Sequence, residues 1–278
     1  MSSIAKTIFL FGILSVLLIV VGGLFGGRSG IYIAFIFSLL MNGGMYFFSE
    51  KIALSMSKAK PLKRETHGDI YAMVEDLASR INMPMPKLYI TPSNQANAFA
   101  TGRGPGHASV AVTEGILKIL SKEELRGVLA HELSHVKNRD VLVATVAAVF
   151  ASSISFVSNM ALFGGFGGDD DDNSGAGIFG IVVAILVPLA ASLVQLAISR
   201  QREFGADASG AKIIGNGSSL ARALVAIHKS ANSNPMKTNP AMSSLYIGNP
   251  LGDFGTKMSK LFSTHPPLNE RVRRLEDI

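Results

Sequence analysis

The chain has 278 residues, of which 48% are hydrophobic and only 17% are charged, and its mean hydropathy is +0.34. These values argue against a wholly globular protein and indicate lipid-facing segments. The net charge of +6 comes from Lys and Arg that gather just outside apolar runs, which favours contact with lipid headgroups over nucleic acid, and cysteine is absent, so only His, Asp or Glu can bind a metal.

Four apolar runs approach the roughly 20 residues that a helix needs to cross the hydrocarbon core of a bilayer. They are Ile4 to Leu24, Ile31 to Phe48, Val141 to Phe163 and Ile178 to Ile198. The first run has an alternative interpretation as a cleaved signal peptide, although no A-x-A site follows it. The last two runs have an alternative interpretation as buried helices of a soluble domain. The pattern predicts a four-helix transmembrane bundle.

Flanking charges predict the orientation of this bundle. Basic residues follow the second run, precede the third and follow the fourth: Lys51, Lys58, Lys60, Lys63, Arg64, Lys137, Arg139, Arg200 and Arg202. Since cytoplasmic loops carry the excess of Lys and Arg, these segments are expected in the cytoplasm. The connection between the third and fourth runs holds four aspartates, Asp169 to Asp172, and no basic residue, so we expect an external, solvated turn.

Two polar segments fall on the cytoplasmic side and are expected to form one domain. The predicted regions are a transmembrane hairpin over residues 1–50, the first half of the domain over 51–140, a second hairpin over 141–198 and the second half over 199–278. Apolar spacing and Gly-Pro-rich turns predict a mostly helical domain with a small β-sheet. The expected elements are a helix from Asp69 to Ile81, strands at Lys87 to Thr91, Asn97 to Thr101 and Ser109 to Val112, and a loop from Asn232 to Asp253 that either covers a cleft or is a plain linker.

A further helix begins at Ser121, which stands in capping-box spacing with Glu124, and it contains the sequence HELSH. His131 and His135 are four residues apart, so both imidazoles lie on one helix face and can share a metal. Glu132 beside them can take a proton from an attacking water and return it to a leaving amine. Zn²⁺ suits this nitrogen and oxygen donor set best. The alternative is that both histidines merely pack or cap a helix.

A catalytic zinc site needs a third protein ligand. The H-E-x-x-H-x-x-G-x-x-H pattern is excluded, because this chain has Asn138 and Val141 where that pattern needs Gly and His. Glu203 and Asp207 are four apart, so a helix presents both on one face. Glu203 is the predicted third ligand, and Asp207 is predicted to hold a zinc-binding imidazole through its second nitrogen. The alternative is that both carboxylates pair with the neighbouring arginines.

The motifs HELSH, REFGAD, NAFATG and STHPPLNER, in this order and among four apolar runs, resemble the HtpX family of bacterial membrane metallopeptidases, which are relatives of the CAAX prenyl-protein endopeptidases. The resemblance covers essentially the whole chain. It implies a zincin-like domain with one zinc per subunit, bound by His131, His135 and Glu203, with Glu132 as general base. It also implies a multi-pass protein of the inner membrane whose cytoplasmic domain degrades misfolded or damaged membrane proteins without ATP, in envelope quality control.

The resemblance implies two further sets of residues. His265 matches a family histidine that helps to stabilise the oxyanion, and Arg271 matches a nearby family arginine; read alone, they are a loop histidine and an ion-pair partner. An edge strand is implied to bind substrate backbone as an added strand, with an ordinary sheet strand as the alternative, and it comprises Asn97, Ala98, Phe99 and Ala100.

Three rival functions remain to be compared. An intramembrane protease would place HELSH within the bilayer, but charged residues flank the motif on both sides. A CAAX-type peptidase needs a chamber for a prenyl chain, and four spans are few to enclose one. A membrane adaptor or transporter with structural zinc would need a closed site of four ligands, whereas three ligands beside Glu132 indicate an open fourth position. The sequence holds no GxxxxGK[ST] phosphate loop, so no ATPase motor of that type is expected.

Overall fold

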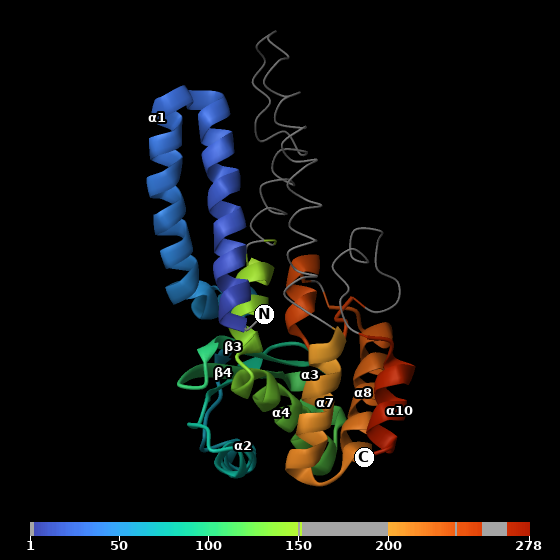
Figure 1. Cartoon of the computed structure of the whole chain (residues 1–278). Helices are drawn as coiled ribbons and strands as arrows, with labels where there is room; N and C mark the ends of the chain where they lie inside the picture. The colour runs from blue at the N-terminus through green and yellow to red at the C-terminus, as the bar shows by residue number, and fades with distance from the viewer. Residues whose placement is uncertain (1–2, 150, 152–199, 237, 252–265) are drawn as a thin grey trace.

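The computed structural model describes residues 3–149, 151, 200–236, 238–251 and 266–278 of the chain. Helices dominate these residues, and the strands form one small mixed sheet (Figure 1). In chain order the elements are α1 (Ser3–Met56), β1 (Lys60–Pro61), α2 (Gly68–Arg80), β2 (Lys87–Thr91), β3 (Ala98–Gly104), β4 (His107–Thr113), α3 (Glu114–Ile119), α4 (Lys122–Lys137), α7 (Arg200–Ile214), α8 (Gly217–Ser233), the 3-10 helix η1 (Pro240–Leu245) and α10 (Leu268–Glu276).

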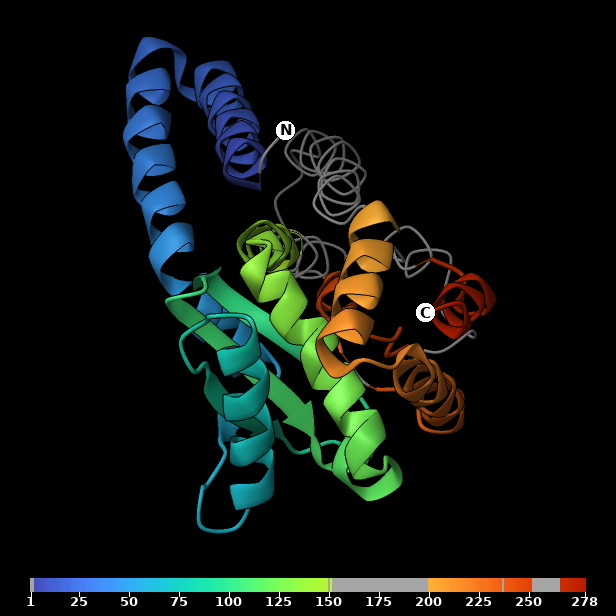
Figure 2. The same cartoon turned by 60° about the horizontal axis from the view of Figure 1, so that its bottom comes forward.

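The first two apolar runs form the two arms of α1, which project from the rest of the molecule side by side (Figures 1 and 2). The arms meet at Gly27, whose φ of 52° lies in the left-handed region that glycine adopts without steric cost. The arm Gly27–Met56 has 30 residues and a mean hydropathy of 1.7, and among the described residues it is the helix long and apolar enough to cross a membrane. Its outer side chains face away from the protein, and Leu40 is 71% exposed.

The predicted four-helix bundle falls only partly within the described residues. The first hairpin is present as α1, and the third run begins as a short apolar helix, Asp140–Val149. Most of the third run, the four aspartates and the whole fourth run lie outside the described residues. A mostly helical chain with a small sheet is confirmed, while the four-span bundle stays a prediction.

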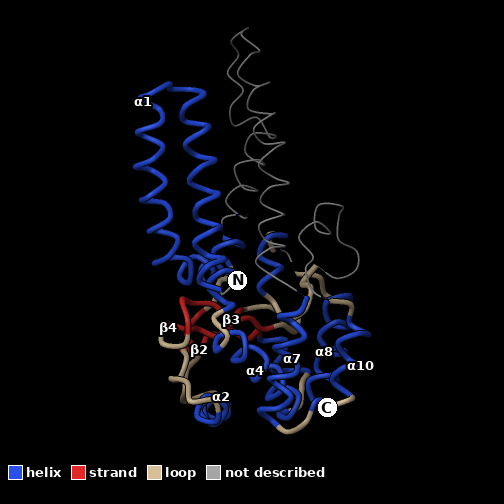
Figure 3. The backbone as a smooth tube through the Cα atoms, viewed as in Figure 1, coloured by secondary structure: helices blue, strands red, loops and turns tan. Residues whose placement is uncertain are grey.

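The sheet has the strand order β1-β2-β4-β3, with β2 parallel to β4 and the other pairs antiparallel. Successive residues of a strand face opposite sides, and the two sides here pack into different cores. Ala98 and Val110 join the core formed with α2 and α4, whereas Phe99 and Ala111 join the core at the base of α1. The sheet therefore lies between the base of α1 and α4 (Figure 3).

The two halves of the predicted domain share one core, because Leu129 of α4, Leu220 of α8 and Leu275 of α10 belong to the same buried cluster. Figure 2 shows α4 between the sheet and the C-terminal helices α7 and α8. A side-chain carbon on Gly210 of α7 would lie 3.0 Å from the backbone nitrogen of His131, so a glycine permits the close crossing of α7 and α4. This crossing brings side chains from distant parts of the sequence to one place.

Local sequence signals located most of these elements well. The strand Lys87–Thr91 has the expected bounds, and the helix expected from Asp69 runs over Gly68–Arg80. The loop expected from Asn232 to Asp253 is the main difference, since it includes the end of α8, the helix η1 and a bridge between Phe99 and Tyr246. Its apolar side chains explain why this segment packs against the rest of the protein, since Met242, Leu245 and Ile247 are buried.

Candidate metal centre

Two histidines of α4 turn their rings toward one space. The helix begins at Ser121, where the Ser121 hydroxyl accepts from the Glu124 N–H and the Glu124 carboxylate accepts from the Ser121 N–H. This capping box fixes the start of the helix, and replacing such a cap by Ala costs about 1 kcal/mol. His131 and His135 then fall one turn apart, with 3.2 Å between their Nε2 atoms.

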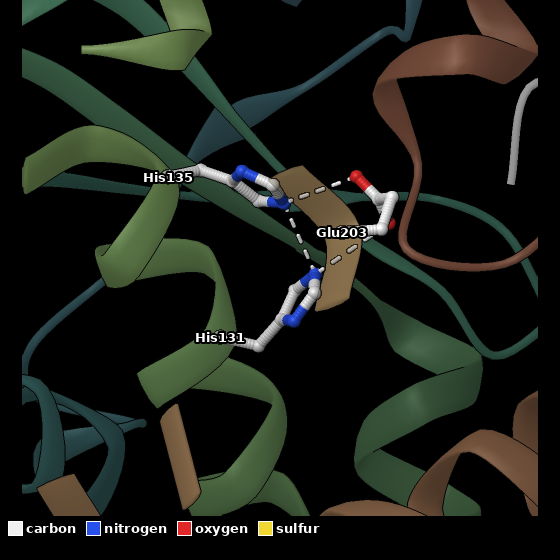
Figure 4. A group of neighbouring side chains, drawn as sticks. All are labelled: His131, His135 and Glu203. Carbon is white, nitrogen blue, oxygen red and sulfur yellow. Dashed lines mark hydrogen bonds and ion pairs between the residues drawn. The ribbon is translucent and has the colours of Figure 1, made fainter. Parts of the chain in front are cut away.

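Glu203 of α7 completes a group of three donors (Figure 4). Its carboxylate oxygens lie 3.3 Å from His135 Nε2 and 4.0 Å from His131 Nε2. A tetrahedral ion bonded to each ligand at about 2.0–2.1 Å would separate the ligands by about 3.4 Å. The observed distances fit such an ion, and the helix expected to carry Glu203 and Asp207 is present as α7.

A carboxylate stands behind each imidazole. Asp207 Oδ1 lies 2.9 Å from His131 Nδ1, and Asp140 Oδ2 lies 3.5 Å from His135 Nδ1. A carboxylate that accepts the Nδ1–H leaves the lone pair on Nε2, which is the nitrogen facing the other donors. Sequence reasoning placed Asp207 in this role but missed Asp140, which follows the end of α4.

The electrostatics of the site favour a bound cation. Burial alone would raise the pKa of Asp207, but the charge and hydrogen bonds of Arg271 and the hydrogen bond of His131 lower it to about 2. Burial alone would lower the pKa of His135, but its hydrogen bonds to Asp140 and Glu203 raise it to about 10. The surrounding carboxylates thus stabilise positive charge between the two rings, and a divalent ion held by His131, His135 and Glu203 would supply that charge.

Arg271 of α10 lies behind the ligands in a buried network. Its Nε and Nη2 donate to the two oxygens of Asp207 at 2.8 and 2.7 Å, and its Nη1 donates to the Ile247 carbonyl at 3.1 Å. Nη1 is also 3.8 Å from Glu203 Oε2. A pocket lies in front of the three donors, and Arg271 is not among the described residues that line it. Arg271 therefore orients Asp207 and Glu203 from behind. Its implied contact with the substrate oxyanion stays a prediction.

Glu132 stands beside the ligands in the pocket. It is 3% exposed, and burial raises its pKa to about 7 against the opposing effect of His135. A base is most effective when its pKa is near the working pH. Ala100 of β3 and Tyr246 line the pocket together with the donors. A peptide bond placed there would have a general base, three metal ligands and a strand edge around it.

The edge strand expected to bind substrate is β3, and the chain itself occupies part of that edge. The segment Tyr246–Gly248, which we call the strap, pairs with it: Tyr246 forms an antiparallel bridge with Phe99, and the Ile247 N–H donates to the Ala98 carbonyl at 2.9 Å. The buried Asn97 side chain holds the far end by donating to the Gly248 carbonyl at 2.9 Å and accepting from the Gly248 N–H at 3.2 Å. Asn97 therefore fixes the strap, and Ala100 remains at the pocket.

The structure brings together His131, Glu132, His135, Glu203 and Asp207 as the sequence predicts. His265 lies outside the described residues. The strap was missed because its pairing with β3 joins residues far apart in the sequence. Its one sequence signal is the apolar run at residues 245–247 within an otherwise polar stretch.

Replacing Asp207 with Asn is expected to weaken zinc affinity about 10- to 100-fold, because the neutral amide no longer strengthens His131 as a ligand and removes the carboxylate that accepts two hydrogen bonds from Arg271. Competitive titration with a chelator measures this affinity. Asp277→Asn, at the exposed C-terminus, is the matched control. A melting temperature measured alongside shows whether the fold survives, and unchanged affinity in folded Asp207→Asn would exclude the role.

Comparisons with known proteins agree with this site. Residues 64–278 match the model of peptidase family M48. A "Protease HtpX homolog" of Pelotomaculum thermopropionicum is 49% identical over 274 residues, with 97% of each chain covered, and one of Syntrophobacter fumaroxidans is 48% identical over 284 residues, with 100% of each covered. The crystal structure of S. mikatae Ste24p superposes with a TM-score of 0.55 at 21% identity, covering 98% of this chain and 65% of that one, which shows a similar fold.

Proposed function

This chain belongs to the HtpX family within peptidase family M48 and is a metalloendopeptidase, and from that premise we propose that it uses zinc to hydrolyse misfolded or damaged membrane proteins at the cytoplasmic face of the bacterial inner membrane, without ATP. The observation that carries the proposal is the convergence of two histidine nitrogens and the Glu203 carboxylate within 4.8 Å of one another. Glu132 lies next to them and lines the same pocket.

Zinc is proposed because the donor set is nitrogen and oxygen, with three protein ligands and a pocket in front of them. When bound, zinc would lower the pKa of water and polarise the scissile carbonyl. His131, His135 and Glu203 would hold it, and Asp140 and Asp207 would fix the two rings. Glu203 would supply the negative charge that a divalent cation needs among its ligands, because Arg271 already balances Asp207 and Arg202 lies 3.4 Å from Asp140.

Glu132 is proposed to transfer the proton of the reaction. It takes a proton from water as the water oxygen attacks the carbonyl carbon, and it returns that proton to the nitrogen as the C–N bond breaks. The products are a carboxylic acid and an amine, so no redox partner or nucleotide is needed. A pKa of about 7 lets one carboxyl group act first as base and then as acid near neutral pH.

Unfolded polypeptide is the proposed substrate class. Main-chain hydrogen bonds to the edge of β3 near Ala100 would hold an extended backbone with little regard to its sequence. The strap pairs with Ala98 and Phe99, and Ala100 lines the same pocket as Glu132. Casein provides the test: detergent-purified full-length protein is expected to cleave it without ATP, at a rate that added ATP does not change. Intact casein after prolonged incubation, or strictly ATP-dependent cleavage, contradicts the proposal.

The cytoplasmic orientation rests on the basic residues at the foot of α1, which include Lys51, Lys58 and Lys60. A reporter fused after Ile278 is expected to lie in the cytoplasm, so a fluorescent protein fused there should fluoresce and an alkaline phosphatase should stay inactive. The opposite pair of results would invert the topology.

A further inference from the structure

A second pocket lies at the foot of α1, away from the metal centre. It opens to solvent. Tyr46 of α1 forms one wall, and Arg103, His107 and the turn Gly104–Gly106 form another. Arg139, just beyond the end of α4, completes it. The pocket therefore joins the membrane arm, the β3–β4 hairpin and the helix that carries HELSH.

The composition of α1 places this pocket at the depth of lipid headgroups. Residues 29–49 carry no Asp, Glu, Lys or Arg, and Arg28 and Glu50 bound the uncharged stretch. About 20 residues cross the hydrocarbon core, so Glu50 lies at its boundary. Tyr46, one turn before Glu50, belongs to the interface, where aromatic rings concentrate. Lys51 follows Glu50 at the same boundary, and its Nζ lies 5.9 Å from the centroid of the Phe48 ring.

The charge of the pocket is positive. Within the described part of the chain, Arg103 and Arg139 form no ion pair, and no acidic residue lines the pocket. Glu50 is the nearest acidic residue along α1, and its carboxylate accepts a hydrogen bond from Ser109 at 2.7 Å. Two guanidinium groups and an imidazole thus face an open space that holds no anion of the protein.

The aromatic residues hold Arg103 in place. Its guanidinium carbon lies 5.6 Å from the Tyr46 ring centroid and 5.2 Å from that of Phe47. Both are cation–π contacts, which attract the guanidinium without using its N–H groups as hydrogen-bond donors, so these donors stay available to an oxyanion. Arg139 has a φ of 59°, a left-handed conformation uncommon outside glycine. Its side chain reaches the pocket, while the next residue, Asp140, faces His135.

We propose that this pocket binds the phosphate of an anionic lipid headgroup, with Arg103 and Arg139 as its main donors. The proposal rests on the proposed membrane insertion of α1, since that insertion brings lipid phosphates to this depth. Arginine binds phosphate oxygens through paired N–H groups. The Tyr46 ring would pack against the lipid next to its headgroup. A lipid bound there would also hold the C-terminal end of the HELSH helix at the membrane surface.

The test measures lipid binding by the full-length protein in detergent, with dioleoylphosphatidylglycerol and dioleoylphosphatidylcholine as probes and native mass spectrometry as readout. Wild type is expected to bind the anionic lipid more tightly. Each basic residue near anionic lipid contributes about fivefold, so Arg103→Gln with Arg139→Gln is expected to lower phosphatidylglycerol affinity about 30-fold. Arg103→Lys with Arg139→Lys keeps both charges and is expected to retain most of the affinity.

The matched control removes two charges elsewhere. Lys122, at the other end of α4, and Arg273 of α10 serve for this, and Lys122→Gln with Arg273→Gln is expected to leave binding unchanged. Equal phosphatidylglycerol affinity in wild type and in the Arg103→Gln, Arg139→Gln protein overturns the proposal. So does an equal affinity for both lipids, or a site that inorganic phosphate fills as readily as the lipid does.

Casein cleavage and resistance to carbonate extraction are measured on the same wild-type preparation. A protein that binds the lipid through these arginines but leaves casein intact contradicts the proposed peptidase function alone. A protein that cleaves casein and resists extraction, yet shows no arginine-dependent lipid binding, contradicts the lipid site alone.

Discussion

Replacing Glu132 with Gln is expected to abolish casein cleavage while zinc stays bound at one ion per chain. Gln keeps the size and polarity of Glu but cannot take a proton from water, and general-base catalysis contributes about 10²- to 10⁴-fold to such rates. Because Glu132 stands beside the three donors and is not one of them, the metal site should survive. Initial cleavage rates and metal content, measured on the same sample, check both parts of the prediction.

Glu123→Gln is the control for this substitution, because Glu123 is an exposed residue in the first turn of the same helix. Its cleavage rate should equal that of wild type. Undiminished cleavage by Glu132→Gln would remove Glu132 from the mechanism, and zinc loss in that variant would show that it binds the metal instead.

Replacing Glu203 with Ala is expected to weaken zinc retention at least about 10- to 100-fold. The change removes one of three ligands, a larger loss than that of a supporting carboxylate, whose removal has effects of this size. It also removes a negative charge 3.8 Å from Arg271, which adds electrostatic repulsion between that cation and the metal. Zinc retained after dialysis against a weak chelator is the measurement.

Glu270→Ala provides the comparison, since Glu270 forms an exposed ion pair with Arg274 on α10. It should retain zinc as wild type does. Melting temperatures identify any general unfolding. If folded Glu203→Ala retained zinc as tightly as wild type, another residue would have to be the third ligand.

The parts of this site that the sequence predicts are those that follow from helix periodicity. His131 and His135 share a face because they are four residues apart, and the same spacing relates Glu203 to Asp207. The capping box at Ser121 fixes where α4 begins, and both hydrogen bonds of the box are present. The strand Lys87–Thr91 lies between prolines, with Pro86 before it and Pro92 after it, and its apolar centre of Leu88, Tyr89 and Ile90 favours a short strand.

The parts that the sequence does not predict depend on contacts between distant elements. Asp140 reaches His135 only because the chain turns at Arg139 after α4 ends. The strap pairs with β3 through residues about 150 positions away, and periodicity carries no information on such a pairing. Arg271 likewise meets Asp207 only once α10 has packed against α7 and α8.

The metal content of the full-length protein, purified in detergent and assayed for casein cleavage before and after chelation, tests the central claim most directly. We expect one zinc ion per chain, loss of cleavage when a chelator removes it, and recovery of cleavage on adding one equivalent of zinc. Full cleavage by protein stripped of metal would contradict the account.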